Sequence, residues 1–440
     1  MTHLLYLLLV ATAFASAAAF AAGPLAWQGT AMIASGPGEK GPWQQNDSRY
    51  RYVDDPTVLI GRDGNVDVAW VDQGRKDVFF QRLSADGSRP LAEPVNVSHS
   101  ADTFSWLPRM ARAPDAPATI YMLWQEIIFS GGSHGGDMLF ARSDDNGATF
   151  STPVNLSDSH GGDGKGRINR AVWHNGSYDL LAGPDSAVYA AWTEYDGPLW
   201  LIRSSDGGKS FSRPRRIAGD ARPARAPSLA LDNRQTLYIA WTSGDDPAAD
   251  IHVAKSGDGG SHFGKPCIIA PDHGYSDAPR LLAAPDGVLH LVYAQSRAGP
   301  FDKYQVHYTR SADGCNFGPP VSISTPLPDV VESAAFPSIS IDDAGRIYVL
   351  FELVPNYRQR PRGLGMTVST DGGTTFSTPL TVPHSRDPAG GANGSRQGMT
   401  NKLAVSGDGF VAVVNSSLRQ DKESRIWLMP GRLKGVAPGR

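Results

Sequence analysis

The chain has 440 residues, including 48 Gly and 33 Pro, and only 19 % of its residues are charged. This composition is typical of many turns and short strands, and it argues against long helices. The formal net charge of −3 excludes a bulk electrostatic attraction to nucleic acid or to an anionic membrane.

The N-terminal segment has the pattern of a signal peptide. An apolar stretch from Leu4 to Phe14 is followed by small residues and by Ala19-Phe20-Ala21. We therefore predict a signal peptide over residues 1–22 and an exported protein, periplasmic or extracellular, with no membrane span after cleavage. An uncleaved N-terminal anchor is the alternative. Residues 23–440 are expected to form a single domain.

Seven apolar segments with the alternation of β-strands recur along the remaining chain. Each is expected to be the second strand of a repeat of about fifty residues, after a short first strand and before a variable loop and a third strand. The segments are 66–70, 120–124, 188–192, 237–241, 289–293, 347–351 and 410–414. Seven such units predict an all-β fold, a β-propeller with seven blades.

The seventh repeat lacks a fourth strand before the C-terminus. The segment from Trp27 to Ala34 resembles the fourth-strand segment from Phe211 to Ala218. We predict that this N-terminal strand pairs beside the strand from Arg425 to Pro430. Such pairing would close the ring and remove two open sheet edges.

A short phrase, Ser-x-Asp-x-Gly-x-x-Phe, recurs in five near-copies, one of them a residue shorter, and in a degenerate sixth copy at Ser84. The five copies begin at Ser143, Ser204, Ser256, Ser311 and Ser369. The repeated phrase fits a hairpin turn, in which the Asp carboxylate accepts backbone N–H bonds, the Gly takes a positive φ and the aromatic side chain anchors the turn. The phrase resembles the Asp-box of the sialidase (BNR-repeat) superfamily. The resemblance implies a propeller with these turns between third and fourth strands, away from the active site. Catalytic sialidases have six blades, so six blades are the alternative.

Two cysteines, Cys267 and Cys315, are the only thiols of the chain. Both are expected near the same rim of neighbouring blades, where either one disulfide or two free thiols would be compatible with the sequence. Neither cysteine has the neighbours of a metal ligand or a nucleophile.

The same resemblance implies a set of site residues on the face where the first strands begin and the second strands end. Catalytic sialidases hold a sugar carboxylate with three arginines, because planar guanidinium pairs bidentately with a planar anion. Arg51, Arg109 and Arg280 are the candidates for this clamp. Tyr275 resembles the family's nucleophile, Glu194 (or Glu332) its partner, and Asp102 the acid/base.

The sequence also departs from the family. The first arginine of the family lies two residues before a proline, where this chain has Asp54 before Pro56. No metal or cofactor motif is present, so no cofactor is expected. Two functions remain open: a retaining exo-α-sialidase acting on terminal acidic sugars, and a non-catalytic propeller that binds glycans or a protein ligand.

Overall fold

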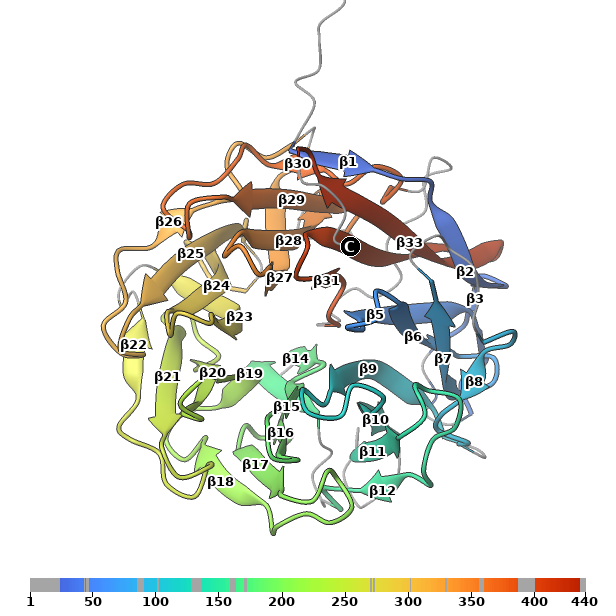
Figure 1. Cartoon of the computed structure of the whole chain (residues 1–440), viewed down its shortest axis with the longest axis horizontal. Helices are drawn as coiled ribbons and strands as arrows, with labels where there is room; N and C mark the ends of the chain where they lie inside the picture. The colour runs from blue at the N-terminus through green and yellow to red at the C-terminus, as the bar shows by residue number, and fades with distance from the viewer. Residues whose placement is uncertain are drawn as a thin grey trace, which may run out of the picture.

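The computed structural model describes residues 24–42, 44, 47–84, 91–100, 103–127, 136–158, 164–169, 172–269, 271, 274–300, 302–328, 331–355, 360–386 and 400–435. The elements in these ranges are all β-strands, and they form a seven-bladed propeller, as predicted (Figure 1). The described residues include no helix that could cross a membrane. The predicted signal peptide lies outside the described residues.

Six blades are four-stranded sheets whose strands follow one another from the channel outwards. Blades 1 and 2 contain β5 (Val53–Ile60), β6 (Val66–Asp72), β7 (Asp77–Leu83), β8 (Val95–Asn96), then β9 (Ser105–Arg112), β10 (Ile120–Glu126), β11 (Asp137–Ser143) and β12 (Val154–Asn155). Blades 3 and 4 contain β15 (Tyr178–Ala182), β16 (Val188–Thr193), β17 (Leu199–Ser204), β18 (Arg215–Ala218), then β19 (Ala224–Leu231), β20 (Leu237–Ser243), β21 (Asp250–Ser256) and β22 (Cys267–Ile269). Blades 5 and 6 contain β23 (Tyr275–Ala283), β24 (Leu289–Ser296), β25 (Gln305–Ser311), β26 (Val321–Ser322), then β27 (Ser333–Ile341), β28 (Ile347–Val354), β29 (Leu364–Ser369) and β30 (Leu380–Thr381).

Blade 7 is built from both ends of the chain. β31 (Leu403–Val405), β32 (Phe410–Arg419) and β33 (Glu423–Leu433) are completed by two N-terminal strands, β1 (Leu25–Trp27) and β2 (Ala31–Gly36). Both pair antiparallel with β33, with Trp27 opposite Gly431 and Ala31 opposite Leu428. Figure 1 shows the blue strands along the red β33. The predicted closure is confirmed, although the pairing is split into two strands.

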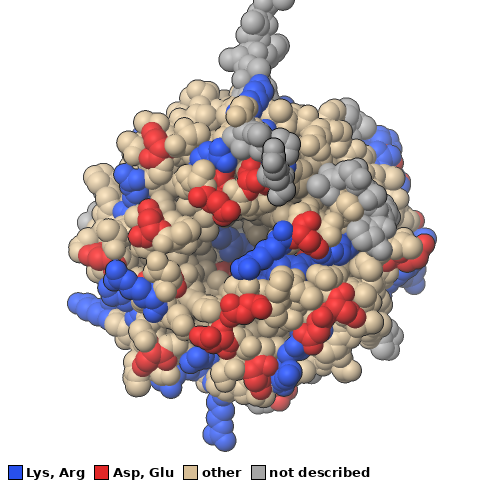
Figure 2. Space-filling model, viewed as in Figure 1, with Lys and Arg blue, Asp and Glu red and all other residues tan. Residues whose placement is uncertain are grey.

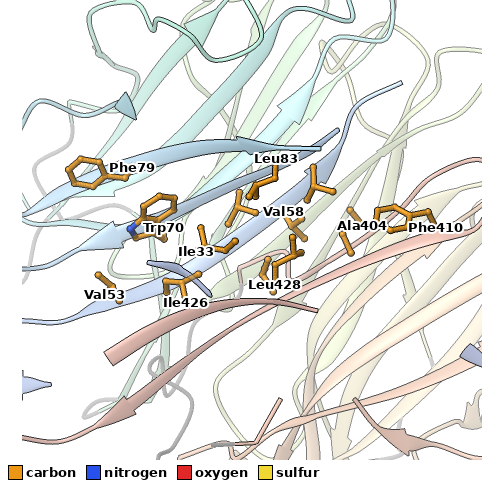
Figure 3. Packing of buried hydrophobic residues seen from close by; sticks show 14 residues of the cluster. Ile33, Val53, Val58, Trp70, Phe79, Leu83, Ala404, Phe410, Ile426 and Leu428 are labelled. Carbon is orange, nitrogen blue, oxygen red and sulfur yellow. The ribbon is translucent and has the colours of Figure 1, made fainter. Parts of the chain in front are cut away.

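The hydrophobic core lies between the blades, because each sheet presents apolar side chains to both neighbours. Figure 3 shows the cluster between blades 7 and 1, in which Ile33 of β2 lies near Trp70 and Ile426. The aromatic residue at the end of each of the first six predicted second strands belongs to these interfaces, and the Trp124 and Trp192 side chains are no more than 2 % exposed. The predicted second strands are confirmed at all seven positions.

The repeated Asp turns join third and fourth strands, as predicted. The carboxylate of each accepts a backbone N–H at 2.7–2.9 Å, and these carboxylates belong to Asp145, Asp206, Asp258, Asp313 and Asp371. The degenerate copy at Ser84 continues into residues outside the described ranges. Basic side chains from the preceding blade also bind three of these turns. Arg142 donates to the Gly207 carbonyl, Lys255 to that of Asp313 at 2.8 Å, and Arg310 to that of Gly372.

Cys267 and Cys315 form a disulfide, with their Cα atoms 5.5 Å apart. Cys267 begins β22, the outermost strand of blade 4, and Cys315 lies in the Asp turn of blade 5. The question that the sequence left open is therefore resolved in favour of a bridge between neighbouring blades.

Candidate functional site

Five of the seven innermost strands carry a bulge at an X-Pro pair. The residue before the proline has a positive φ of 50–54° in each, and the strand register shifts there; these residues are Asp55, Leu107, Ala226, Ala278 and Phe336. Left-handed backbone at non-glycine residues costs free energy and persists only where the surrounding packing holds it. Three of these residues, from successive innermost strands, pack against one another. The bulges therefore bring side chains of neighbouring innermost strands into contact in blades 4 to 6.

Two arginines directly follow the prolines of such bulges, Arg109 on β9 and Arg280 on β23. The Arg280 Nη1 atom lies 4.0 Å from the Asp179 Oδ1 atom. Because β23 belongs to blade 5 and Asp179 lies on β15 of blade 3, the Arg280 side chain reaches past the innermost strand of blade 4. Figure 2 shows a hollow in the middle of the ring with basic side chains inside it and acidic ones around its rim.

The Arg109 guanidinium is buried without a counter-ion. Its side chain is 3 % exposed, its carbon Cζ lies 5.8 Å from the centre of the Tyr178 ring, and Nη2 donates to the Gly176 carbonyl at 3.5 Å. The Nε atom has no hydrogen-bond partner, and no carboxylate of the described residues lies within ion-pair distance. Burial, and then the charge of Arg280, lower the pKa of Arg109 to about 9. Two cations thus share a channel in which Asp179 is the nearby carboxylate.

Asp55 lies at the bulge of β5 and contacts β9, the strand that carries Arg109. Its Oδ2 atom accepts the backbone N–H of Leu107 at 3.3 Å, and the Tyr178 hydroxyl donates to the Leu107 carbonyl at 2.6 Å. The backbone of a single residue of β9, Leu107, therefore links Asp55 of blade 1 to Tyr178 of blade 3. Burial, and then the neighbouring Asp54, raise the pKa of Asp55 to about 8.

Tyr275 belongs to a separate polar cluster at the start of β23. Its hydroxyl accepts from Arg225 at 2.5 Å and donates to Asp277 at 3.3 Å, and its ring packs edge-on against Tyr304. Thr242 donates a further hydrogen bond to Asp277 at 3.0 Å. Tyr275 and Arg225 are both 0 % exposed, so this cluster is closed to solvent. Burial, and then Asp277, raise the pKa of Tyr275 above its ordinary value.

The structure brings together two of the six predicted site residues. Arg109 and Arg280 share the channel, whereas Arg51 is on β4 (Tyr50–Arg51), 63 % exposed and paired with Glu39 of β3 (Glu39–Lys40). Glu194 lies in the turn between β16 and β17 of blade 3, and Tyr275 opens β23 of blade 5. Asp102 lies outside the described residues. The catalytic and binding roles given to these six residues remain predictions.

Asp55, Asp179 and Arg225 all lie on innermost strands, and sequence reasoning gave none of them a role in the site. Two of these strands contain an X-Pro pair. The recurrence of X-Pro in five repeats was a readable signal of a shared bulge. Within the described residues, no group of three or more His, Cys, Asp or Glu side chains could hold a metal ion.

Comparison with known proteins supports the fold and leaves the family open. No family model matches the chain, and curated protein sequences give no match either. Solved structures do match: the polysaccharide lyase Uly1 has a TM-score of 0.55 at 11 % identity, covering 93 % of this chain and 100 % of that one. An ulvan lyase bound to -[GlcA(1-4)Rha3S]- has a TM-score of 0.54 at 12 % identity, with 92 % and 99 % covered. The α-L-arabinanase of Penicillium chrysogenum has a TM-score of 0.50 at 16 % identity, with 75 % and 94 % covered. At these identities the similarity shows a propeller fold and does not show membership of the sialidase superfamily.

Proposed function

We propose that this protein is a carbohydrate-active propeller that binds an acidic glycan in its central channel, with a sugar carboxylate against Arg109 and Arg280. The observation that carries the proposal is the buried Arg109 guanidinium, which has a second guanidinium nearby and no ion-pair partner among the described carboxylates. A buried charge is costly unless it is paired, so such a site gains most from an anionic ligand.

The chemistry of the pair suits a carboxylate. Guanidinium groups present a planar fork of donors that matches a planar anion, and such charge-assisted bonds are among the stronger hydrogen bonds in proteins. The names of the similar structures also support an acidic glycan as the ligand. Two of these structures are polysaccharide lyases, and one of the two is bound to a saccharide that contains an acidic sugar.

Cleavage of terminal sialic acid is the second candidate. The observation in its favour is the contact between the Tyr275 hydroxyl and the Asp277 carboxylate at 3.3 Å, since a Tyr nucleophile needs a nearby base. The complete burial of Tyr275 argues against a nucleophilic role, because its hydroxyl must reach the substrate. Turnover of an activated sialoside by wild type, lost in Tyr275→Phe, would establish this candidate.

We also propose that the protein is exported. Disulfides form and persist in oxidising compartments, which agrees with the bridge between Cys267 and Cys315 and with the predicted signal peptide. Detection of the mature N-terminus in a periplasmic or culture fraction would test this proposal.

Calorimetric titration tests the binding site directly. Oligogalacturonate, sialyllactose and neutral lactose would be titrated into wild type, Arg109→Ala, Arg109→Lys and Arg280→Ala. We expect an acidic glycan to bind and lactose not to bind. Loss of charge-assisted bonds to one arginine should cost about 1.5–3 kcal/mol, roughly 10- to 100-fold in affinity. Arg109→Lys keeps the charge and should lose part of the affinity, because an ammonium cannot bind bidentately.

Arg216→Ala is the matched control, because Arg216 lies on β18 at the outer edge of blade 3 and pairs with Asp220 at 2.6 Å. It should bind like wild type. Equal affinity in Arg109→Ala and wild type, with both variants folded, would refute the channel site.

A further inference from the structure

Charged residues of three blades occupy equivalent positions of their innermost strands. The position is the one that pairs with the fourth residue of the predicted second strand. In blades 2, 3 and 5 it is charged, and the pairs are Arg109–Leu123, Asp179–Ala191 and Arg280–Val292. The carboxylate of Asp179 interacts electrostatically with both arginines. The three charged groups therefore belong to one level of the channel.

Asp179 is held by the next blade through only one of its carboxylate oxygens. The Oδ2 atom accepts the backbone N–H of Leu229 at 2.8 Å. The Oδ1 atom lies 4.0 Å from the Arg280 Nη1 atom, too far for a hydrogen bond, and it has no other partner among the described residues. The Asp179 and Arg280 side chains are 18 % and 11 % exposed, so neither is closed to solvent. An acceptor oxygen with unused lone pairs is thus left beside a guanidinium group.

The neighbouring blade shows that the contact with the next strand needs no charge. Ser228 of blade 4 occupies the position equivalent to Asp179, opposite Ala240, and its hydroxyl accepts the backbone N–H of Leu281 at 3.0 Å. Leu281 is the residue of blade 5 that corresponds to Leu229 of blade 4. Because a serine suffices for this contact, the negative charge of Asp179 is free to serve a ligand.

We propose that Asp179 is a specificity-determining residue, which accepts a hydrogen bond from a ligand hydroxyl while Arg109 and Arg280 bind the ligand carboxylate. This inference rests on the proposed binding of an acidic glycan and names its class: a sugar acid with a free hydroxyl on the carbon next to the one that bears the carboxylate. A ligand without this hydroxyl brings two carboxylates together beside Arg280 with no donor between them, and they repel each other. With the hydroxyl, the Oδ1 atom gains a charge-assisted hydrogen bond.

A hexuronic acid at the end of a chain meets this requirement. Its carboxylate is attached to carbon 5 of the sugar, and a hydroxyl is attached to the adjacent carbon 4. Within a (1→4)-linked chain, carbon 4 carries the glycosidic bond, so only the non-reducing end offers the donor. In sialic acid, the ring carbon next to the one that bears the carboxylate has no hydroxyl. We therefore expect the site to prefer a terminal uronic acid to an internal one and to sialic acid.

Calorimetric titration of matched ligands tests this preference in wild type. Methyl β-D-glucuronide and methyl β-D-galacturonide differ only in the configuration at carbon 4, and each would be compared with its 4-deoxy analogue. We expect at least one of the two to bind roughly 10- to 100-fold more tightly than its analogue, the range for a hydrogen bond to a charged group. This comparison does not depend on the folding of any variant.

Two variants assign the preference to Asp179. Asp179→Ser introduces the residue that blade 4 has at this position, so it should keep the Leu229 contact and remove the charge. Loss of the negative charge should raise the affinity for both ligands by the same factor, whereas loss of the acceptor acts only on the ligand with the hydroxyl. The preference should therefore nearly vanish. Asp179→Asn keeps the length of the side chain and offers only a neutral hydrogen bond, so it should retain part of the preference.

The ratio of the two affinities separates this role from a structural or purely electrostatic one. Equal ratios in wild type and in both folded variants would overturn the inference. Binding of the uronides to wild type with no preference for the hydroxyl would also overturn it and leave the carboxylate site intact. If no acidic ligand binds to wild type, including oligogalacturonate and sialyllactose, the proposed function itself is refuted.

Discussion

At the scale of residues, the prolines of the innermost strands determine which side chains reach the channel. A left-handed residue before proline breaks the alternation of five of these strands, and this residue is an aspartate, a leucine, a phenylalanine or, on two strands, an alanine. The residue after proline is Arg on β9 and β23 and a hydroxyl residue on the other three strands. Small changes in an otherwise repeated segment thus decide which innermost strands carry a cation after the bulge.

Asp55→Asn should change how stability depends on pH. The unfolded carboxyl ionises near pH 4, whereas the folded one keeps its proton up to about pH 8, so folding takes up a proton between these values. The free energy of unfolding of wild type should therefore fall as pH rises from 4 to 8, by up to about 1.4 kcal/mol per pH unit from this group. The variant lacks this slope and should be the more stable protein at pH 8. Urea unfolding at several pH values checks this, and parallel curves for the two proteins would contradict it.

The sequence predicted one part of this chemistry and missed another. Arg109 and Arg280 could be proposed because guanidinium groups near first-strand starts suit an acidic ligand. The burial of Asp55 could not be seen, because it depends on a bulge of β5 and on packing that leaves one carboxyl oxygen buried without a partner. Its other oxygen binds the backbone of β9 in the next blade, a contact that the sequence does not reveal.

At the scale of elements, each blade is fixed to the next by contacts outside its own sheet. Arg142, Lys255 and Arg310 bind the Asp turn of the following blade, and the disulfide joins blade 4 to blade 5. The seven second strands were predictable because their alternation, and in six of them a terminal aromatic residue, are local properties. The division of the closing pair into β1 and β2 was not, because it depends on the register against β33.

Removal of the disulfide should destabilise the ring without changing the channel. The double variant Cys267→Ser/Cys315→Ser lacks the cross-link between two residues that are 48 positions apart, so its unfolded chain is less constrained. The loss of such a disulfide typically lowers the free energy of unfolding by about 2–4 kcal/mol. We expect a lower melting temperature and unchanged glycan affinity per folded molecule. Reduced wild type should melt like the double variant; identical melting of reduced and oxidised wild type would show that the bridge adds no stability.

Deletion of residues 24–36 should lower the melting temperature markedly. It removes Leu25 and Ile33, which are 7 % and 5 % exposed, and leaves β33 as an open edge strand. Exposed edges also promote association between chains, so light scattering should increase on heating. A truncated protein that melts and scatters like the full chain would mean that blade 7 does not need these strands.

At the scale of the whole molecule, a weakly acidic protein encloses a cationic channel. The net charge of −3 gives no long-range attraction for an acidic glycan, so attraction must arise locally from Arg109 and Arg280. The ring architecture makes this possible, because seven innermost strands bring residues 109, 179 and 280 into one space.

Binding of an acidic glycan should therefore weaken with salt, but only moderately. The Debye length falls from about 10 Å at 0.1 M to about 3 Å at 1 M salt, and buried pairs are screened less than exposed ones. We expect a several-fold loss of oligogalacturonate affinity between these concentrations. An affinity independent of salt would argue against ion pairing, and a loss of many orders of magnitude would indicate binding on the exposed surface instead.

The shared construction of blade 7 has a consequence for biosynthesis. Residues 25–36 leave the ribosome among the first, and their partner strand, residues 423–433, leaves among the last. At about 5–20 residues per second, the early strands wait tens of seconds for β33. A nascent chain that stalls or ends within the last repeat therefore exposes unpaired strands at both ends of an open ring. Exporting the chain before it folds, if residues 1–22 direct secretion, would postpone closure until both ends are present in the same compartment.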